Sequence, residues 1–144
     1  MRRRSSGVLM HITSLPGKQG IGTFGKSAYD FVDFLEETQQ TYWQLLPLTT
    51  TSYGDSPYQS FSAVAGNLNL IDFDLLEEEG LLEKVDYEGV NFGDNPEKVD
   101  YGLLFDVRRP ILEKAVANTA KYSNVLAEIE EFEKDNSSWL ADYA

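Results

Sequence analysis

The residues best suited to chemistry lie in one short run, "YGDSPYQSFS", which extends from Tyr53 to Ser62. A sugar presents an apolar CH face and a rim of hydroxyls, so a sugar site combines an aromatic ring with short polar groups. The run supplies both kinds of side chain within a few positions, in Tyr53, Asp55, Ser56, Tyr58 and Gln59. This composition favours glycoside chemistry.

A second interpretation of the same run needs no ligand. Gly-Asp-Ser-Pro is a good turn sequence, and a tyrosine beside such a turn often packs its ring and hydrogen-bonds its hydroxyl. Residue chemistry alone does not separate the turn from the sugar site.

Other chemistries find less support in the sequence. The glycines of "GKQGIGTFG" match a phosphate-binding pattern only in "GIGTFG", whose preceding strand lies too far upstream, so they indicate a flexible loop. His11 could act as a catalytic base, but it follows an apolar run without Ser-His-Asp spacing, and a satisfied strand-end histidine is the better interpretation. With no cysteine and one histidine, the sequence offers no thiolate or histidine-based metal site.

Composition and charge limit the class of protein. The 144 residues, 42% of them hydrophobic, are enough for one domain with a core and tight for two. No apolar run approaches the ~20 residues that cross a bilayer, and the apolar stretch after "MRRR" is too short for a signal peptide. We therefore expect no membrane partner. The net charge of −12 repels phosphate backbones, so we expect no nucleic-acid partner either. Lack of cysteine is compatible with a cytoplasmic location.

The elements that would position the polar run are two strands and a helix. Residues 7–13 and 41–48 are short apolar runs that predict buried strands, the second closed by Pro47. Between them the apolar stripe of an amphipathic helix begins near Ser27, with Ser27 and Asp30 spaced as an N-cap and its partner; the stripe consists of Ala28, Phe31, Val32 and Leu35. Strand, helix and strand predict a parallel βαβ unit.

In parallel α/β folds the ligand site forms from the loops at the carboxyl ends of the strands. The loops 17–25 and 49–62 both follow predicted strands, so we expect them to face the same mouth.

The second half of the chain predicts mostly helices. One ends at Gly80, a plausible left-handed cap, and residues 81–100 are irregular. A helix over 101–121 contains Pro110, which should bend or divide it, and a last helix begins with Ser123 or Asn124 as its cap. The shift in charge near residue 73 marks the best boundary between two parts.

The segments "GVLMHITSLPGKQGIGTFG", "YWQLLPL" and "SYGDSPYQSFSAVAGN" together resemble the N-terminal part of the bacterial 4-alpha-glucanotransferases, also called amylomaltases or disproportionating enzymes. The likeness continues through "LIDFDLL", "VDYG" and "WLADYA", so it covers nearly the whole chain.

The resemblance implies an α/β fold, an incomplete (β/α)8 barrel. Residues 1–72 would supply its first βα units with the substrate loop, and 73–144 part of a mostly helical insertion. It also implies a retaining enzyme that passes part of an α-1,4-glucan to the 4-hydroxyl of glucose or of another glucan, without a cofactor. The family's catalytic carboxylates lie on later strands, so none is expected in this chain; cap, turn and surface roles suffice for Asp55, Asp72 and Asp74.

Carried over residue by residue, the resemblance places Ser56 and Tyr58 at the donor-side sugar site, with Asp55 and Gln59 shaping the loop. It places Tyr53 at a secondary glucan contact. The chain departs from the family pattern in "TTTS" at 49–52, usually Gly-Pro-Thr-Gly, and in "GNLN" at 66–69, usually Gly-Asn-Pro-Tyr. These departures affect the details of the sugar subsites.

Two alternatives to a transferase are a hydrolase of the same barrel clan, in which water accepts the sugar, and a self-standing glucan-binding or interaction module. We expect the 144 residues alone to be inactive and to self-associate, because two barrel strands leave unpaired edges.

Overall fold

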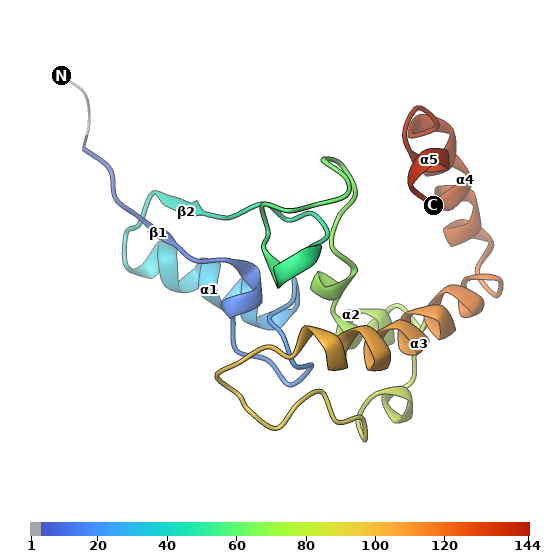
Figure 1. Ribbon diagram of the computed structural model, residues 1–144, viewed down its shortest axis with the longest axis horizontal. Helices are drawn as coiled ribbons and strands as arrows, with labels where there is room; N and C mark the ends of the chain where they lie inside the picture. Colours follow the sequence, from blue (N-terminus) through green and yellow to red (C-terminus); the bar gives the residue numbers. More distant parts are fainter. Residues whose placement is uncertain (1–3) are drawn as a thin grey trace.

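The computed structural model describes residues 4–144, with the side chain of Tyr53 left out (Figure 1). In chain order the strands and helices are β1 (Gly7–Leu9), α1 (Lys26–Glu37), β2 (Tyr42–Gln44), α2 (Phe73–Glu78), α3 (Tyr101–Thr119), α4 (Ser123–Asp135) and α5 (Leu140–Tyr143). Four single turns of 3-10 helix connect them, η1 (Ile12–Ser14), η2 (Tyr53–Asp55), η3 (Leu68–Leu70) and η4 (Lys84–Asp86).

Strands β1 and β2 pair in parallel, with Val8 opposite Trp43, and α1 connects them. The predicted βαβ unit is therefore confirmed. Both strands are shorter than the predicted 7–13 and 41–48, because the chain turns into η1 at Ile12 and leaves the end of β2 without a partner strand. The last ladder contact is Met10 N–H donating to the carbonyl of Gln44 at 3.1 Å.

Helix α1 begins two residues earlier than predicted. Gly25 is its N-cap, whereas the Ser27 hydroxyl donates to the carbonyl of Pro16 at 2.6 Å. Asp30 pairs with Lys26 instead of reaching back to the helix start. The predicted Ser27 cap is therefore wrong, because a neighbouring loop takes the hydroxyl.

The apolar stripe of α1 covers the strands only in part. Ala28 and Leu35 are buried in a core with Ile12, Leu15 and Leu70. Beside that core the ring of Phe31 meets the ring of Trp43 edge-on, with centroids 4.8 Å apart. Val32, the remaining member of the stripe, is 49% exposed. One edge of the helix thus presents apolar surface that no other described residue covers.

The second half builds another core, between α2, α3 and the irregular segment 81–100. Its buried members are Ile21, Phe73, Leu81, Leu82, Tyr87, Phe92, Leu104, Ile111 and Ala115. Gly80 has φ +76°, as predicted for a left-handed residue that ends α2. Ile21 belongs to the loop after β1, so this core also ties the two halves together.

Two details of the helices differ from the sequence-based prediction. Of the two predicted effects of Pro110, bending or dividing α3, division does not occur, because α3 continues from Tyr101 to Thr119. The proline is exposed, so water can reach the carbonyl that it leaves without a donor. Tyr122 is the N-cap of α4, in place of Ser123 or Asn124.

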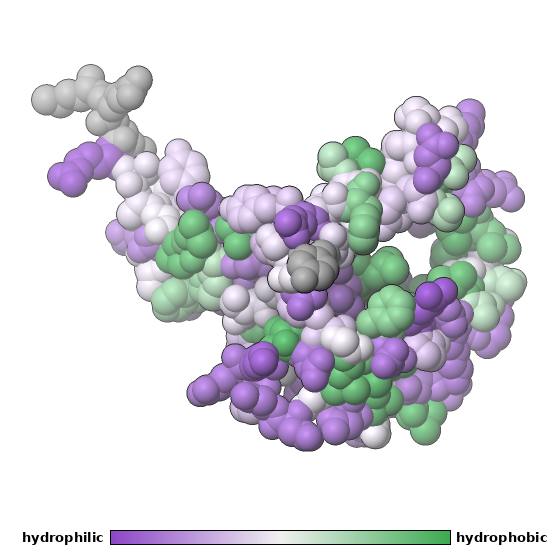
Figure 2. Space-filling model, in the orientation of Figure 1, coloured by the Kyte–Doolittle hydropathy of each residue, from purple (hydrophilic) through white to green (hydrophobic). Residues whose placement is uncertain are grey.

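Helices α4 and α5 form an arm that rises from the end of α3, beside the loop that follows β2 (Figure 1). Figure 2 shows the surface hollowed between that arm and the loop, with apolar side chains in the hollow. Within residues 4–144, no helix is long and apolar enough to cross a membrane.

Candidate functional site

The loop that carries the polar run is closed at its base. Thr49 and Gly66 form an antiparallel bridge, and Asn67 N–H donates to the carbonyl of Leu48 at 2.9 Å. These backbone contacts hold the two ends of the loop together, a few residues after the end of β2.

Inside the loop the backbone makes two successive turns. Asp55 N–H donates to the carbonyl of Ser52 at 3.0 Å, and Gln59 N–H donates to that of Ser56 at 3.1 Å. Gly54 and Asp55 have φ of +75° and +56°, the left-handed region in which glycine and aspartate are best tolerated. The turn predicted from Gly-Asp-Ser-Pro is therefore present.

Serine and threonine hydroxyls hold the far side of the loop. Ser60 Oγ lies 3.2 Å from Thr50 Oγ1 and donates to the carbonyl of Ser62 at 2.6 Å. Ser62 Oγ in turn accepts from the N–H groups of Val64 and Ala65. These bonds stiffen a segment that contains neither helix nor strand.

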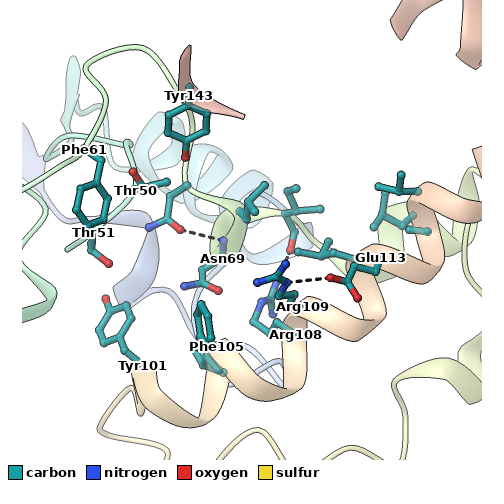
Figure 3. A pocket seen from close by; sticks show the side chains of 18 of the residues that line it. Thr50, Thr51, Phe61, Asn69, Tyr101, Phe105, Arg108, Arg109, Glu113 and Tyr143 are labelled. Atoms are coloured by element: carbon teal, nitrogen blue, oxygen red, sulfur yellow. Dashed lines mark hydrogen bonds and ion pairs between the residues drawn. The ribbon is translucent and has the colours of Figure 1, made fainter. Parts of the chain in front are cut away.

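A cleft of about 820 Å³ opens between this loop and α3 (Figure 3). Thr50, Thr51 and Phe61 line it from the loop, and Tyr101 and Phe105 face them from α3 (Figure 3). Tyr143 of α5 closes the upper side, and Asp55, Asn67 and Asn69 add polar groups. A concave, mostly apolar site with a few polar groups and aromatic walls is typical of sites for small organic ligands.

The structure places the five predicted site residues unequally. Asp55 lines the cleft, whereas Ser56, Tyr58 and Gln59 do not. Tyr58, on the same loop, is 71% exposed, and its backbone N–H donates to Ser56 Oγ at 3.3 Å. The side chain of Tyr53 lies outside the described part of the structure.

Tyr101 is one of several residues of the cleft that the sequence did not predict as site residues. It begins α3, and burial raises the pKa of its hydroxyl, a hydrogen bond to Thr13 lowers it, and the charge of Asp55 raises it again. Its hydroxyl therefore lies close to both the loop after β1 and the loop after β2. The available signal was the "VDYG" segment, which marked the start of a helix without indicating what the tyrosine would face.

His11 has a structural environment, as expected for a satisfied strand-end histidine. Its Nε2–H donates to the carbonyl of Pro47 at 3.2 Å, and Nδ1 lies 2.7 Å from the hydroxyl of Thr13. Both ring nitrogens are therefore occupied within the protein.

The carboxylates of residues 4–144 form no arrangement that would hold a metal ion. Among the described residues, no group of three or more histidine, aspartate or glutamate side chains is placed to do so. Asp72 caps α2 by accepting from the N–H groups of Asp74 and Leu75. Asp74 pairs with Lys84 at 2.8 Å. The cap and surface roles predicted for these two residues are confirmed.

The loop 49–62 lines the cleft after β2, whereas no residue of the loop 17–25 does, so the two loops do not share this cleft as the sequence predicted. A parallel βαβ unit with a ligand site after the carboxyl end of a strand is the arrangement of α/β enzymes and ligand-binding proteins. A family model described as 4-alpha-glucanotransferase matches residues 10–144, and the chain therefore belongs to this family.

Curated relatives and a solved structure are similar to this chain over nearly its full length. It is 60% identical over 144 residues to a 4-alpha-glucanotransferase of Streptococcus pneumoniae, covering 100% of this chain and 28% of the relative. The Thermus thermophilus protein of that name is 44% identical over 98% of this chain and 28% of its own length. A solved structure, amylomaltase from Streptococcus agalactiae in complex with acarbose, superposes with a TM-score of 0.94 at 61% identity, over 99% of this chain and 28% of that one. The chain thus spans little more than a quarter of these relatives.

Proposed function

We propose that the chain is the N-terminal part of a 4-alpha-glucanotransferase that transfers α-1,4-glucan segments to the 4-hydroxyl of glucose or of another glucan. The proposal rests on one observation: the whole chain superposes on an amylomaltase with a TM-score of 0.94 at 61% identity.

The proposed chemistry is a retaining double displacement. A carboxylate attacks the anomeric carbon while a carboxylic acid protonates the departing glycosidic oxygen, and a covalent glycosyl intermediate results. The acceptor 4-hydroxyl then loses its proton to the second carboxylate as its oxygen attacks the anomeric carbon, and the nucleophile leaves. Both carboxylates would come from later strands of the complete protein.

The proposed fold is an incomplete (β/α)8 barrel, with residues 1–72 in the barrel and 73–144 in a helical insertion. Two observations support the barrel part. The outer edges of β1 and β2 have no partner strand among the described residues, and Leu9 of β1 is 58% exposed. A barrel closes such edges with its other strands and covers such side chains.

The proposed substrate contacts come from the loop after β2. Tyr58 would offer its exposed ring to a glucose unit, with Ser56 as a polar neighbour, while Asp55 and Gln59 shape the loop; Tyr53 would contact a glucan further away. The Streptococcus agalactiae amylomaltase was solved with acarbose, and we extend glucan binding to this chain from that relative. The complete protein would act in the cytoplasm, on maltodextrins and glucose.

The test is to incubate the complete protein with maltotriose and separate the products. A transferase releases glucose together with chains longer than maltotriose. Glucose and maltose without longer chains would instead identify the hydrolase alternative. Binding of maltodextrin without any turnover would favour the binding module.

A further inference from the structure

The largest fully buried side chain among the described residues belongs to a cation, Arg108, at 1% exposure. It lies in α3, and its guanidinium reaches across to the first half of the chain. Nη1 donates to the carbonyl of Gln19 at 3.1 Å, and Nη2 donates to the carbonyl of Ile71 at 2.5 Å. One side chain thus joins α3 to the loop after β1 and to the segment before α2.

One further contact fixes the plane of the guanidinium. It lies over the ring of Phe73, with its central carbon 4.2 Å from the ring centroid, in the geometry of a cation–π contact. Burial lowers the pKa of Arg108 to about 10, and the negative charge of Asp72 opposes that shift. Arg108 therefore stays charged at neutral pH.

The acceptors of Arg108 are themselves held in place. Gln19 is buried, and its Oε1 accepts from Phe73 N–H at 3.0 Å while Nε2 lies 3.4 Å from the carboxylate of Asp72. Thr23 donates to the same carboxylate at 2.5 Å. The loop after β1 and the start of α2 thus form one hydrogen-bonded unit, onto which Arg108 fastens α3.

Stability alone is a poor reason for this arrangement. Burying a charge costs several kcal/mol, and an apolar side chain of similar volume often serves a core as well or better. Here Nε has no hydrogen-bond partner in the described structure, which adds to the cost. The planar guanidinium can bond two carbonyls at once in fixed directions, which an apolar side chain cannot do.

The hydrogen bond between Arg108 and Ile71 lies at the wall of the cleft. Arg108 and Ile71 both line it, and Tyr101 stands roughly two helical turns before Arg108 on α3. The segment that ends at Ile71 begins with Asn67, which is bonded to the base of the substrate loop. The bond from Nη2 to Ile71 therefore sets the spacing between the loop wall and the α3 wall.

We infer that Arg108 is a positioning residue for glucan binding, because it holds the α3 wall of the cleft at a fixed distance from the loop that follows β2. This inference rests on the proposed function. In this role Arg108 itself does not contact the glucan.

The experiment compares Arg108→Met and Arg108→Lys with wild type in the complete protein. The probes are acarbose affinity by calorimetry and the separate values of KM and kcat on maltotriose. We expect Arg108→Met to weaken acarbose binding about tenfold and to raise KM more than it lowers kcat, because the reacting carboxylates would lie elsewhere. Arg108→Lys, which keeps the charge and can donate to one carbonyl at a time, should lose about threefold.

The matched control is Lys121→Met, which removes an exposed cation just after α3, outside the cleft. Circular dichroism and thermal unfolding identify any variant that fails to fold. If Arg108→Met does not fold, Arg108→Lys decides. A folded Arg108 variant with wild-type acarbose affinity and wild-type KM would overturn the inference. Failure of the wild-type protein to act on maltotriose or to bind acarbose would instead reject the proposed function.

Discussion

The carboxylate of Asp72 lies against Gly25 so closely that a Cβ on that glycine would stand 2.1 Å from Oδ2. Gly25 is the N-cap of α1, and Asp72 is the N-cap of α2. One buried carboxylate therefore stands at the positive ends of two helices, where negative charge is favoured. Thr23 and Gln19 bond the same carboxylate from the loop that leads into α1.

This contact predicts that Gly25→Ala destabilises the complete protein by about 1–3 kcal/mol, since the added methyl group must displace a buried charged group. The measurement is the shift of the unfolding midpoint in urea. Gly89→Ala is the matched control, because a Cβ at Gly89 meets nothing within 4 Å. Equal shifts for the two variants would show that the Asp72 contact is not tight in solution.

The exposed ring of Tyr58 predicts an effect on catalysis. In the complete protein, Tyr58→Ala should lower kcat/KM on maltotriose by an amount equivalent to about 1–3 kcal/mol, because a sugar loses its aromatic platform. Tyr58→Phe keeps the ring and should retain most of the activity. Thermal unfolding of each variant separates a lost contact from a misfolded protein. Wild-type kinetics for Tyr58→Ala would remove Tyr58 from the sugar site.

The pair of Asp74 and Lys84 predicts a pH-dependent contribution to stability. The hydrogen bond from Lys84, and then that from Tyr87, lowers the pKa of Asp74 below its ordinary value of 3.8. A carboxyl group whose pKa is lowered by folding stabilises the native state above the unfolded-state pKa. That stabilisation is lost as the pH falls through the lowered value.

Asp74→Asn should therefore destabilise the complete protein at pH 7, by less than about 1 kcal/mol because the pair is half exposed. The difference from wild type should shrink as the pH falls below about 4. Urea unfolding at a series of pH values measures it. Glu78→Gln, at an exposed position of the same helix, is the control. A difference that stays constant down to the lowest pH at which both proteins fold would contradict the assignment.

The uncovered surfaces of the βαβ unit predict the behaviour of the 144 residues alone. They should show no transferase activity on maltotriose and should self-associate, because β1 and β2 have free edges and α1 exposes Val32. The measurements are product analysis and mass in solution by light scattering. A folded monomer that disproportionates maltotriose would refute both expectations.

Local pattern sufficed for some features of this protein. The apolar runs around Val8 and Trp43 predicted the parallel βαβ unit correctly, but not the burial of its strands, whose outer residues Leu9 and Tyr42 are exposed. Gly80 predicted the end of α2, since a left-handed residue favours glycine. Boundaries that depend on competition for one hydroxyl were predicted wrongly, as at Ser27, whose side chain bonds to Pro16 across the loop.

By itself the sequence determined the family, the βαβ unit and the turn in which Asp55 and Ser56 stand, because each of these leaves a recognisable pattern in consecutive residues. Only the tertiary structure decided that Tyr101 faces the loop after β2 and that Arg108 fastens α3 to Gln19 and Ile71. Those contacts join residues far apart in sequence. Arg108 bonds to backbone carbonyls, which every residue type has, so no sequence pattern could predict its partners. Likewise, no pattern near Tyr101 shows which loop it would face.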